Sequence, residues 1–223
     1  MISIAIDGPS GAGKSTIAKA VAAKLGFYYV DTGAIYRSVG LYISRAGRCD
    51  DTGFVELCLP EILIEIAYGE DGLQHIILNG ENVTSAIREN AVSAYAAQVS
   101  AIPAVRSYLL DMQRSLAQKN NVIMDGRDIG TVVLPKADLK IYLTASVGQR
   151  AKRCWKELQE KGDNTTLETI SKQIAQRDYA DMHREIAPLR QAEDAILVDT
   201  SDMTLDESIE TVYHLALKKT NAE

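Results

Sequence analysis

The chain has 223 residues, of which 46% are hydrophobic and 24% charged. This composition excludes collagen-like and disordered proteins and suits one large domain with its own core. Its 24 basic and 30 acidic residues leave a net charge of −6, which excludes a general electrostatic attraction to nucleic acid or to an anionic membrane. Any anionic ligand must therefore be held by a local cluster of basic side chains.

Cysteine usage and the apolar segments indicate the compartment. Cys49, Cys58 and Cys154 are odd in number and lack Cys-x-x-Cys spacing, which favours reduced thiols and disfavours a zinc site. The first apolar stretch ends at Ile6 and is too short for a secretory signal. No run of about 18 apolar residues, the length that spans a bilayer, occurs. We therefore expect a soluble, cytoplasmic protein.

The first predicted strand, residues 2–6, leads into a segment that satisfies the phosphate-binding pattern G-x-x-x-x-G-K-[ST]. An apolar period over Ile17, Val21 and Leu25 predicts the helix that must follow such a loop. Backbone N–H groups of this loop type surround phosphate oxygens. Lys14 is expected to reach the β- and γ-phosphates and Ser15 to bind Mg²⁺. The residues expected to bind the nucleoside triphosphate are Gly8, Pro9, Ser10, Gly11, Ala12, Gly13, Lys14, Ser15 and Thr16.

A second predicted strand, residues 27–30, is followed by Asp31-Thr32-Gly33-Ala34-Ile35-Tyr36-Arg37. Ligands of open α/β sheets bind at the carboxyl ends of the strands, so this segment is placed to meet an acceptor. Arg37 is expected to bind an acceptor phosphate through two parallel hydrogen bonds. The alternative is an ordinary solvated arginine.

Residues 61–83 break the α/β alternation. Ile62, Ile64, Ile66 and Tyr68 alternate at a period of two, and residues 73–78 form a second predicted strand. Turns are predicted at Asp71-Gly72 and at Asn79-Gly80, before Val83. The pattern predicts a small antiparallel meander inserted in the core.

A third predicted strand, residues 121–124, ends directly before Asp125-Gly126-Arg127-Asp128. A carboxylate after a buried strand organises Mg²⁺ in P-loop proteins, which is the predicted role of Asp125. The alternative is that Asp125 caps a turn and that Arg127 pairs with Asp128 at the surface.

A fourth predicted strand, residues 139–143, precedes residues 146–190, two helical stretches around a polar turn at 161–164. Arg177, Asp181 and Arg184 are spaced to share one helical face, either toward a ligand or as a solvated row of ion pairs. We predict a mobile lid that excludes water from a transferring phosphoryl group. Five further basic residues crowd the adjoining segment: Arg150, Lys152, Arg153, Lys156 and Lys161.

The last predicted strand, residues 195–198, is followed by a capping box at Thr204-Leu205-Asp206-Glu207 and a helix toward Leu217. The alternation of strands and helices predicts an α/β, three-layer P-loop kinase fold. It consists of a five-stranded parallel sheet with helices on both faces, the small antiparallel insert and the helical lid. No Asn-Lys-x-Asp guanine-reading motif occurs, which disfavours a GTPase.

Taken together, these motifs resemble the bacterial cytidylate kinases. The resemblance covers nearly the whole chain and rests on residues 7–15, 31–37 and 125–131, on Arg177-Asp178 and on Ala187-Pro188-Leu189. It implies transfer of the γ-phosphoryl group of ATP, with Mg²⁺, to CMP and dCMP in pyrimidine nucleotide metabolism. It also implies a monomer with no nucleic-acid or membrane partner.

The resemblance further implies one domain, residues 1–223, with three parts. The core comprises residues 1–32, 104–145 and 191–223, the nucleoside-monophosphate (NMP) region residues 33–103, and the lid residues 146–190. The antiparallel insert and Ile87-Arg88 resemble the family's enlarged NMP region. Two other readings stay open: a kinase for another small acceptor such as shikimate, and a nucleotide sensor without turnover.

On the phosphate side, the resemblance places the CMP phosphate on Arg37 and Arg127, with Thr32 and Tyr36 lining its pocket. It places Arg150 and Arg153 where lid arginines meet ATP. The catalytic residues it implies are Lys14, Arg37, Arg127 and Arg184. No general base is named, because the CMP phosphate is already largely ionised at neutral pH.

On the nucleoside side, the resemblance places Arg106 and Asp128 at the cytosine edge, with Arg184 close by. Arg177 and Asp181 would hold the sugar. One departure is visible: Ala97 precedes Gln98 where some members of the family place a base-contacting serine. Gln98 or a water molecule is then expected to replace that hydrogen bond.

Overall fold

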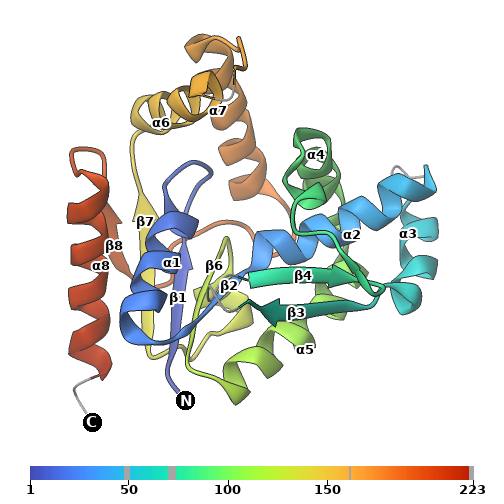
Figure 1. The fold of residues 1–223 in the computed structure, drawn as a ribbon, viewed down its shortest axis with the longest axis horizontal. Helices are drawn as coiled ribbons and strands as arrows, with labels where there is room; N and C mark the ends of the chain where they lie inside the picture. Colours follow the sequence, from blue (N-terminus) through green and yellow to red (C-terminus); the bar gives the residue numbers. More distant parts are fainter. Residues whose placement is uncertain (48–50, 70–73, 161, 221–223) are drawn as a thin grey trace.

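A parallel sheet forms the centre of the computed structural model, which describes residues 1–47, 51–69, 74–160 and 162–220 (Figure 1). The sheet has five strands in the order β2-β6-β1-β7-β8, as predicted. Its strands are β1 (Ser3–Asp7), β2 (Tyr28–Asp31), β6 (Val122–Gly126), β7 (Leu139–Thr144) and β8 (Ile196–Asp199). Every neighbouring pair in it is parallel, so the carboxyl ends of all five strands lie at one edge.

Helices cover both faces of this sheet because both faces are apolar. Ile4 and Ile6 of β1 pack with α1 (Lys14–Leu25) and α8 (Leu205–Thr220). Ala5, which points to the opposite face, shares a core cluster with side chains of α2 (Thr32–Ala46) and α5 (Pro103–Lys119). Continuous burial on both sides is typical of a parallel sheet. The predicted three-layer architecture is confirmed.

The ends of α1 and α8 follow from local chemistry. Gly26 ends α1 with φ 67°, a left-handed conformation that favours glycine. At the start of α8, Glu207 N donates to Thr204 Oγ1 at 3.2 Å, and Thr204 N donates to a Glu207 carboxylate oxygen at 2.8 Å. This is the predicted capping box, and the helix that it begins continues to Thr220.

The NMP region contains the predicted antiparallel meander, β3 (Ile64–Tyr68), β4 (Gln74–Leu78) and β5 (Glu81–Asn82). Ile64 pairs with Leu78 and Tyr68 with Gln74; the predicted turn at Asp71-Gly72 lies outside the described residues, as does Cys49. The Tyr68 hydroxyl donates to the Tyr29 carbonyl at 2.9 Å and ties the meander to β2. The other elements here are α3 (Thr52–Cys58), η1 (Leu59–Glu61), η2 (Ala86–Arg88) and α4 (Asn90–Val99).

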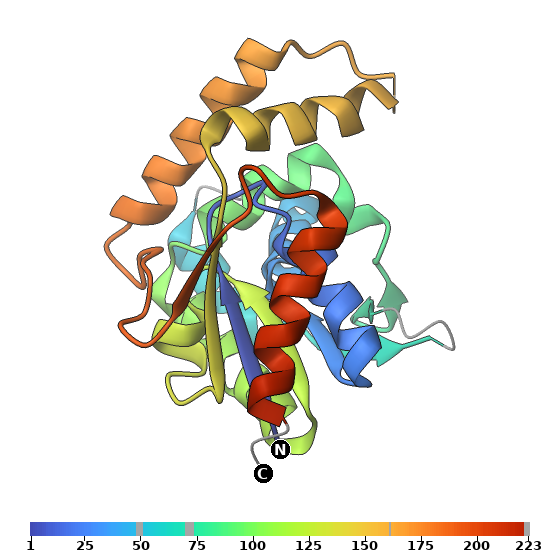
Figure 2. The same ribbon diagram turned by 90° about the vertical axis from the view of Figure 1, so that its left-hand side faces the viewer.

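The lid helices α6 (Val147–Glu160) and α7 (Leu167–His183) lie across the carboxyl edge of the sheet (Figure 2). Thr166 caps α7 by accepting from Thr169 N. The expectation that Arg177, Asp181 and Arg184 share one helical face is wrong for Arg184. Its backbone is extended, at φ −63° and ψ 144°, because α7 ends at His183.

One further element matters for the site. After β6, a short π-helical turn, η3 (Ile129–Val133), begins directly behind Asp128.

Across the described ranges, no helix is long and apolar enough to cross a membrane.

Candidate active site

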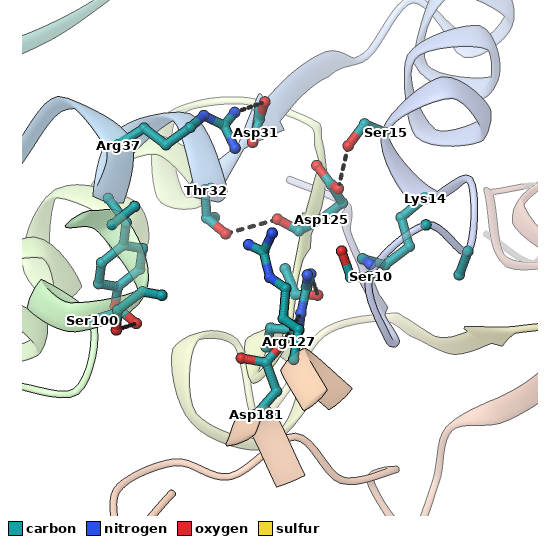
Figure 3. Close-up of a pocket in the computed structure, with 18 of the residues that line it drawn as sticks. Ser10, Lys14, Ser15, Asp31, Thr32, Arg37, Ser100, Asp125, Arg127 and Asp181 are labelled. Carbon is teal, nitrogen blue, oxygen red and sulfur yellow. Dashed lines mark hydrogen bonds and ion pairs between the residues drawn. The ribbon is translucent and has the colours of Figure 1, made fainter. Parts of the chain in front are cut away.

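A cavity of about 340 Å³ opens at the carboxyl edge of the sheet, between the P-loop, the NMP region and the lid. Figure 3 shows Ser10, Lys14 and Ser15 on one side of it, Thr32 and Arg37 on the other, and Asp125 and Arg127 between them. The predicted site residues that line it are Ser10, Gly11, Ala12, Gly13, Lys14, Ser15, Thr16, Thr32, Tyr36, Arg37, Arg106, Asp125, Arg127, Asp128, Arg153, Arg177, Asp181 and Arg184. Gly8, Pro9 and Arg150 are not among its lining residues.

The P-loop holds its lysine in a buried position. Lys14 is 5% exposed, and its Nζ donates to the Pro9 carbonyl at 2.8 Å. Burial, together with the charge of Arg127, lowers the pKa of Lys14 to about 7. At Gly8, φ is 151° and a Cβ would lie 1.9 Å from the Leu143 carbonyl oxygen, so only glycine fits where the loop leaves β1. A bound polyphosphate would supply the negative charge that this buried lysine lacks.

Ser15 and Asp125, the two residues predicted to bind Mg²⁺, contact each other. The Ser15 hydroxyl donates to Asp125 Oδ2 at 2.9 Å. Burial raises the pKa of Asp125 to about 6, and the neighbouring Asp31 charge acts in the same direction. These two hard oxygen donors fit Mg²⁺, which binds one or two protein oxygens and completes its shell with phosphates and water.

Tyr29 joins this pair and is a residue that the sequence did not point to. Its hydroxyl donates to Asp125 Oδ1 at 2.9 Å, so both carboxylate oxygens of Asp125 have a hydroxyl partner. The ring is 5% exposed. In the sequence, Tyr29 reads as one more apolar residue of a buried strand, and no pattern distinguishes it.

Arg37 is not a solvated arginine. Its side chain is 17% exposed and pairs with Asp31 Oδ2 at 2.8 Å. Arg88 reaches the same oxygen at 3.3 Å from η2. Arg37 Nε is buried without a hydrogen-bond partner in the part of the chain that the structure describes. This orphaned donor suits an anionic ligand, because an unmade hydrogen bond of a buried group is costly.

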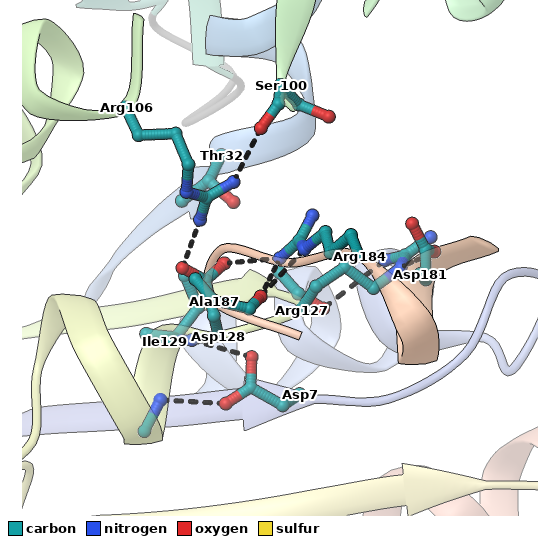
Figure 4. A network of polar contacts seen from close by, with 12 residues as sticks. Asp7, Thr32, Ser100, Arg106, Arg127, Asp128, Ile129, Asp181, Arg184 and Ala187 are labelled. Atoms are coloured by element: carbon teal, nitrogen blue, oxygen red, sulfur yellow. Dashed lines mark hydrogen bonds and ion pairs between the residues drawn. The ribbon is translucent and has the colours of Figure 1, made fainter. Parts of the chain in front are cut away.

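Arg127 and Asp128 do not pair with each other, so the alternative of a surface ion pair between them is wrong (Figure 4). Arg127 Nε donates to Asp181 Oδ2 on α7 at 2.8 Å. Asp128 accepts a close hydrogen bond from Arg106 on α5 and lies 3.4 Å from an Arg184 nitrogen. Asp128 therefore lies between two guanidinium groups that come from distant segments.

Burial affects the other arginines of this cluster. It lowers the pKa of Arg177 and of Arg184, and in each case a neighbouring arginine adds to the effect, Arg127 for Arg177 and Arg106 for Arg184. A solvated row of ion pairs would not be desolvated in this way. The cluster is an interior, electropositive wall of the cavity.

The wall nearest α4 consists of small side chains. Ala96, Ala97 and Ser100 line the cavity there. The Ser100 hydroxyl donates to the Ala97 carbonyl at 2.9 Å, and Arg106 donates to the Ser100 carbonyl at 3.0 Å. Arg106 also lies over the Tyr36 ring, 5.5 Å from its centroid. Arg106 is therefore oriented by its neighbours before any ligand binds.

The two lid arginines differ in position. Arg153 lines the cavity and donates to the Thr200 carbonyl at 2.6 Å. Arg150 is 4% exposed; its guanidinium donates to the Ser10 and Ala145 carbonyls, at 2.9 and 2.7 Å, and pairs with Asp178 Oδ2 at 2.7 Å. In the described structure Arg150 joins α6, α7 and the P-loop, and its predicted contact with ATP stays a prediction.

Comparison with known proteins agrees with this geometry. A family model described as Cytidylate kinase matches residues 4–218. The cytidylate kinase of Carboxydothermus hydrogenoformans is 46% identical over 217 residues, which cover 97% of each chain. That of Caldicellulosiruptor saccharolyticus is 48% identical over 222 residues, which cover 97% of this chain and 96% of the relative. Among solved structures, an uncharacterized protein from Eubacterium ventriosum has a TM-score of 0.51 at 12% identity, with full coverage of both chains, which is a likeness of fold alone. Since the family model and these relatives align with almost the whole chain, the chain belongs to the cytidylate kinase family.

Proposed function

We propose that this chain transfers the γ-phosphoryl group of ATP to CMP, giving ADP and CDP, with Mg²⁺ as the metal ion. The observation that carries the proposal is that one cavity is lined both by a P-loop with its buried lysine and by the pair of Asp128 and Arg106. The first matches a triphosphate, and the second matches the hydrogen-bonding edge of cytosine.

At the base end, the chemistry of Asp128 and Arg106 is complementary to cytosine. Cytosine offers an amine donor next to a ring-nitrogen acceptor, whereas uracil offers a carbonyl acceptor next to a ring N–H donor. An ionised carboxylate can only accept and a guanidinium can only donate, so this pair suits cytosine. With uracil, the Asp128 carboxylate would face the carbonyl acceptor and the Arg106 guanidinium would face the N–H donor, so buried polar atoms would stay unpaired.

At the phosphate end, Arg37 and Arg127 hold the CMP phosphate opposite the P-loop. An oxygen of that phosphate attacks the γ-phosphorus, and the bond from the γ-phosphorus to the β,γ-bridging oxygen breaks, so that ADP leaves. Lys14 and the arginines stabilise the charge on the transferring group and align the two oxygens. Ser15 and Asp125 would hold Mg²⁺, which neutralises phosphate charge when bound. The attacking oxygen is already ionised, so no residue has to remove a proton.

The sugar of the acceptor is assigned to Arg177 and Asp181, which line the cavity from α7. We extend the proposal to dCMP, since the phosphate and base contacts described above do not involve the 2′-hydroxyl. A monomer is sufficient for this assignment, because every residue that it uses comes from one chain.

The test is ADP release from ATP in the presence of CMP, dCMP, UMP, AMP or shikimate, compared side by side in the same buffer. We expect rapid release with CMP and dCMP and at least about 100-fold lower kcat/KM with UMP, because two desolvated contacts are lost. Preference for AMP or shikimate would contradict the proposed acceptor. ATP binding without turnover for any acceptor would indicate a nucleotide sensor instead.

A further inference from the structure

Asp7 is a buried carboxylate that the roles assigned so far do not use. It is the last residue of β1, directly before Gly8 of the P-loop, and it is 5% exposed. Its two oxygens accept hydrogen bonds from the backbone of η3: Oδ1 from Ile129 N at 2.8 Å and Oδ2 from Gly130 N at 2.7 Å. One carboxylate therefore fixes two consecutive peptide units (Figure 4).

Those peptide units follow directly behind Asp128. The Asp128 carbonyl accepts from Val132 N at 2.9 Å and from Val133 N at 3.1 Å, which closes the π-helical turn on itself. Asp7 binds the two amides at the open start of that turn, where a helical turn has unpaired donors. The backbone of Asp128 is thus held from both sides, at φ −145° and ψ 25°, outside the usual helical and extended regions.

The surroundings leave this arrangement little freedom. Burial raises the pKa of Asp7 to about 6, and the two amide hydrogen bonds counteract that rise, so the ionised form depends on them. A Cβ added to Gly130 would lie 3.1 Å from Lys140 Cδ and 3.4 Å from Asp7 Oδ2. Because Ile129 directly follows Asp128 and the turn closes on the Asp128 carbonyl, a displacement of Ile129 and Gly130 would change the backbone of Asp128.

We propose that Asp7 is a positioning residue that sets the orientation of Asp128 and hence the preference of this enzyme for cytosine over uracil. Asp7 touches neither substrate in this assignment. Asp7 connects β1, which leads into the P-loop, to the backbone directly behind Asp128, which contacts the base. The ATP site and the base site are therefore joined through this carboxylate. This inference rests on the proposed function, since it uses Asp128 as the base-contacting residue.

The test is Asp7→Asn, with Asp138→Asn as the matched control. Asparagine keeps the size, but its amide group would place a donor against one of the two N–H groups. Asp138 is also a carboxylate that binds β1, but at the opposite end of the strand, where Oδ2 accepts from Ser3 N at 2.7 Å and from Ser3 Oγ at 3.0 Å. Both variants remove a carboxylate clamp from the same strand, and only one clamp faces Asp128.

The readouts are kcat/KM for CMP and for UMP at pH 8, the dissociation constant of ATP, and Tm. For Asp7→Asn we expect kcat/KM for CMP to fall at least about tenfold and the CMP:UMP ratio to narrow at least about fivefold, with the ATP dissociation constant within about threefold of wild type. For Asp138→Asn, a lower Tm is the only change that we expect, and the CMP:UMP ratio should equal that of the wild type. A folded Asp7→Asn protein with the wild-type ratio would overturn the inference and make Asp7 a purely structural residue.

A second variant covers the case in which Asp7→Asn does not fold. Gly130→Ala leaves the carboxylate intact but places a methyl group 3.1 Å from Lys140 Cδ, next to the amide that Asp7 binds. It should therefore narrow the CMP:UMP ratio in the same direction by a smaller factor. An unchanged ratio in this variant would also overturn the inference. The proposed function is tested separately, on the wild-type protein: absence of CMP turnover there would refute it. The ratios measured in the variants bear only on the role of Asp7.

Discussion

The two ends of the cavity are built in opposite ways. The P-loop is a contiguous segment that leads into α1, and its Lys14 Nζ donates to the Pro9 carbonyl within the same segment. The acceptor end is assembled by pairs that are distant in the chain: Arg106 with Asp128, 22 residues apart, and Arg127 with Asp181, 54 residues apart. The comparison teaches that phosphate binding is a local property of this sequence, whereas selection of the acceptor is a property of its fold.

The largest expected effect lies at the local end. Lys14→Ala should lower kcat at least about 100-fold while the protein stays folded, because it removes charge stabilisation at the transferring phosphate and leaves the loop backbone intact. The measurement is steady-state turnover together with a circular dichroism melt. A folded variant that keeps more than about a tenth of wild-type kcat would move the catalytic centre away from the P-loop.

The second-largest effect is expected at Arg37, where the acceptor phosphate is proposed to bind. Arg37→Lys keeps the charge but loses the planar guanidinium, and we expect kcat/KM for CMP to fall by about 10–100-fold. Arg45→Lys on the same helix is the control, since Arg45 binds Glu81 through two hydrogen bonds, of 2.6 and 2.9 Å, on the surface. Equal and small losses in the two variants would place Arg37 outside the site.

At Asp128, which is proposed to contact the base, a substitution should change the selectivity between CMP and UMP more than the rate. In Asp128→Asn the amide can donate to the uracil carbonyl, so the CMP:UMP ratio of kcat/KM should narrow at least about tenfold. Asp194→Asn, which removes a 66% exposed partner of Lys140, is the control and should leave the ratio unchanged. A wild-type ratio in folded Asp128→Asn would transfer base recognition to the wall around Ala97 and Ser100.

The smallest effect is expected far from both ends. Thr204→Ala removes the N-cap of α8 and should lower the free energy of unfolding by about 1 kcal/mol without changing kcat or either KM. Chemical denaturation measures the first quantity and the kinetic assay the others. A change in kcat in this variant would mean that the start of α8 affects the geometry of the active site.

The same division decides what could be predicted from the sequence. The strand positions, the meander and the two helices between residues 146 and 190 follow from local periodicity, and the structure confirms them. The P-loop follows from a local motif, and the structure places it between β1 and α1. The partner of Arg127 could not be predicted, because its neighbour Asp128 is closer in the chain than Asp181, and only the placement of α7 decides between them. Tyr29 and Asp7 were missed for the same reason: their partners, Asp125 and the amides of η3, are brought to them by β6 and the turn that follows it.

The buried guanidinium of Arg150 has a consequence for how this molecule responds to salt. It holds the Ser10 carbonyl of the P-loop and the Asp178 carboxylate of α7 at the same time. Movement of α7 away from α6 would separate two charges whose side chains are only 5% and 10% exposed, and water would then have to hydrate both. Ions in solution screen the separated charges more than the buried pair. The balance between a docked and an undocked α7 should therefore move toward the undocked form as ionic strength rises.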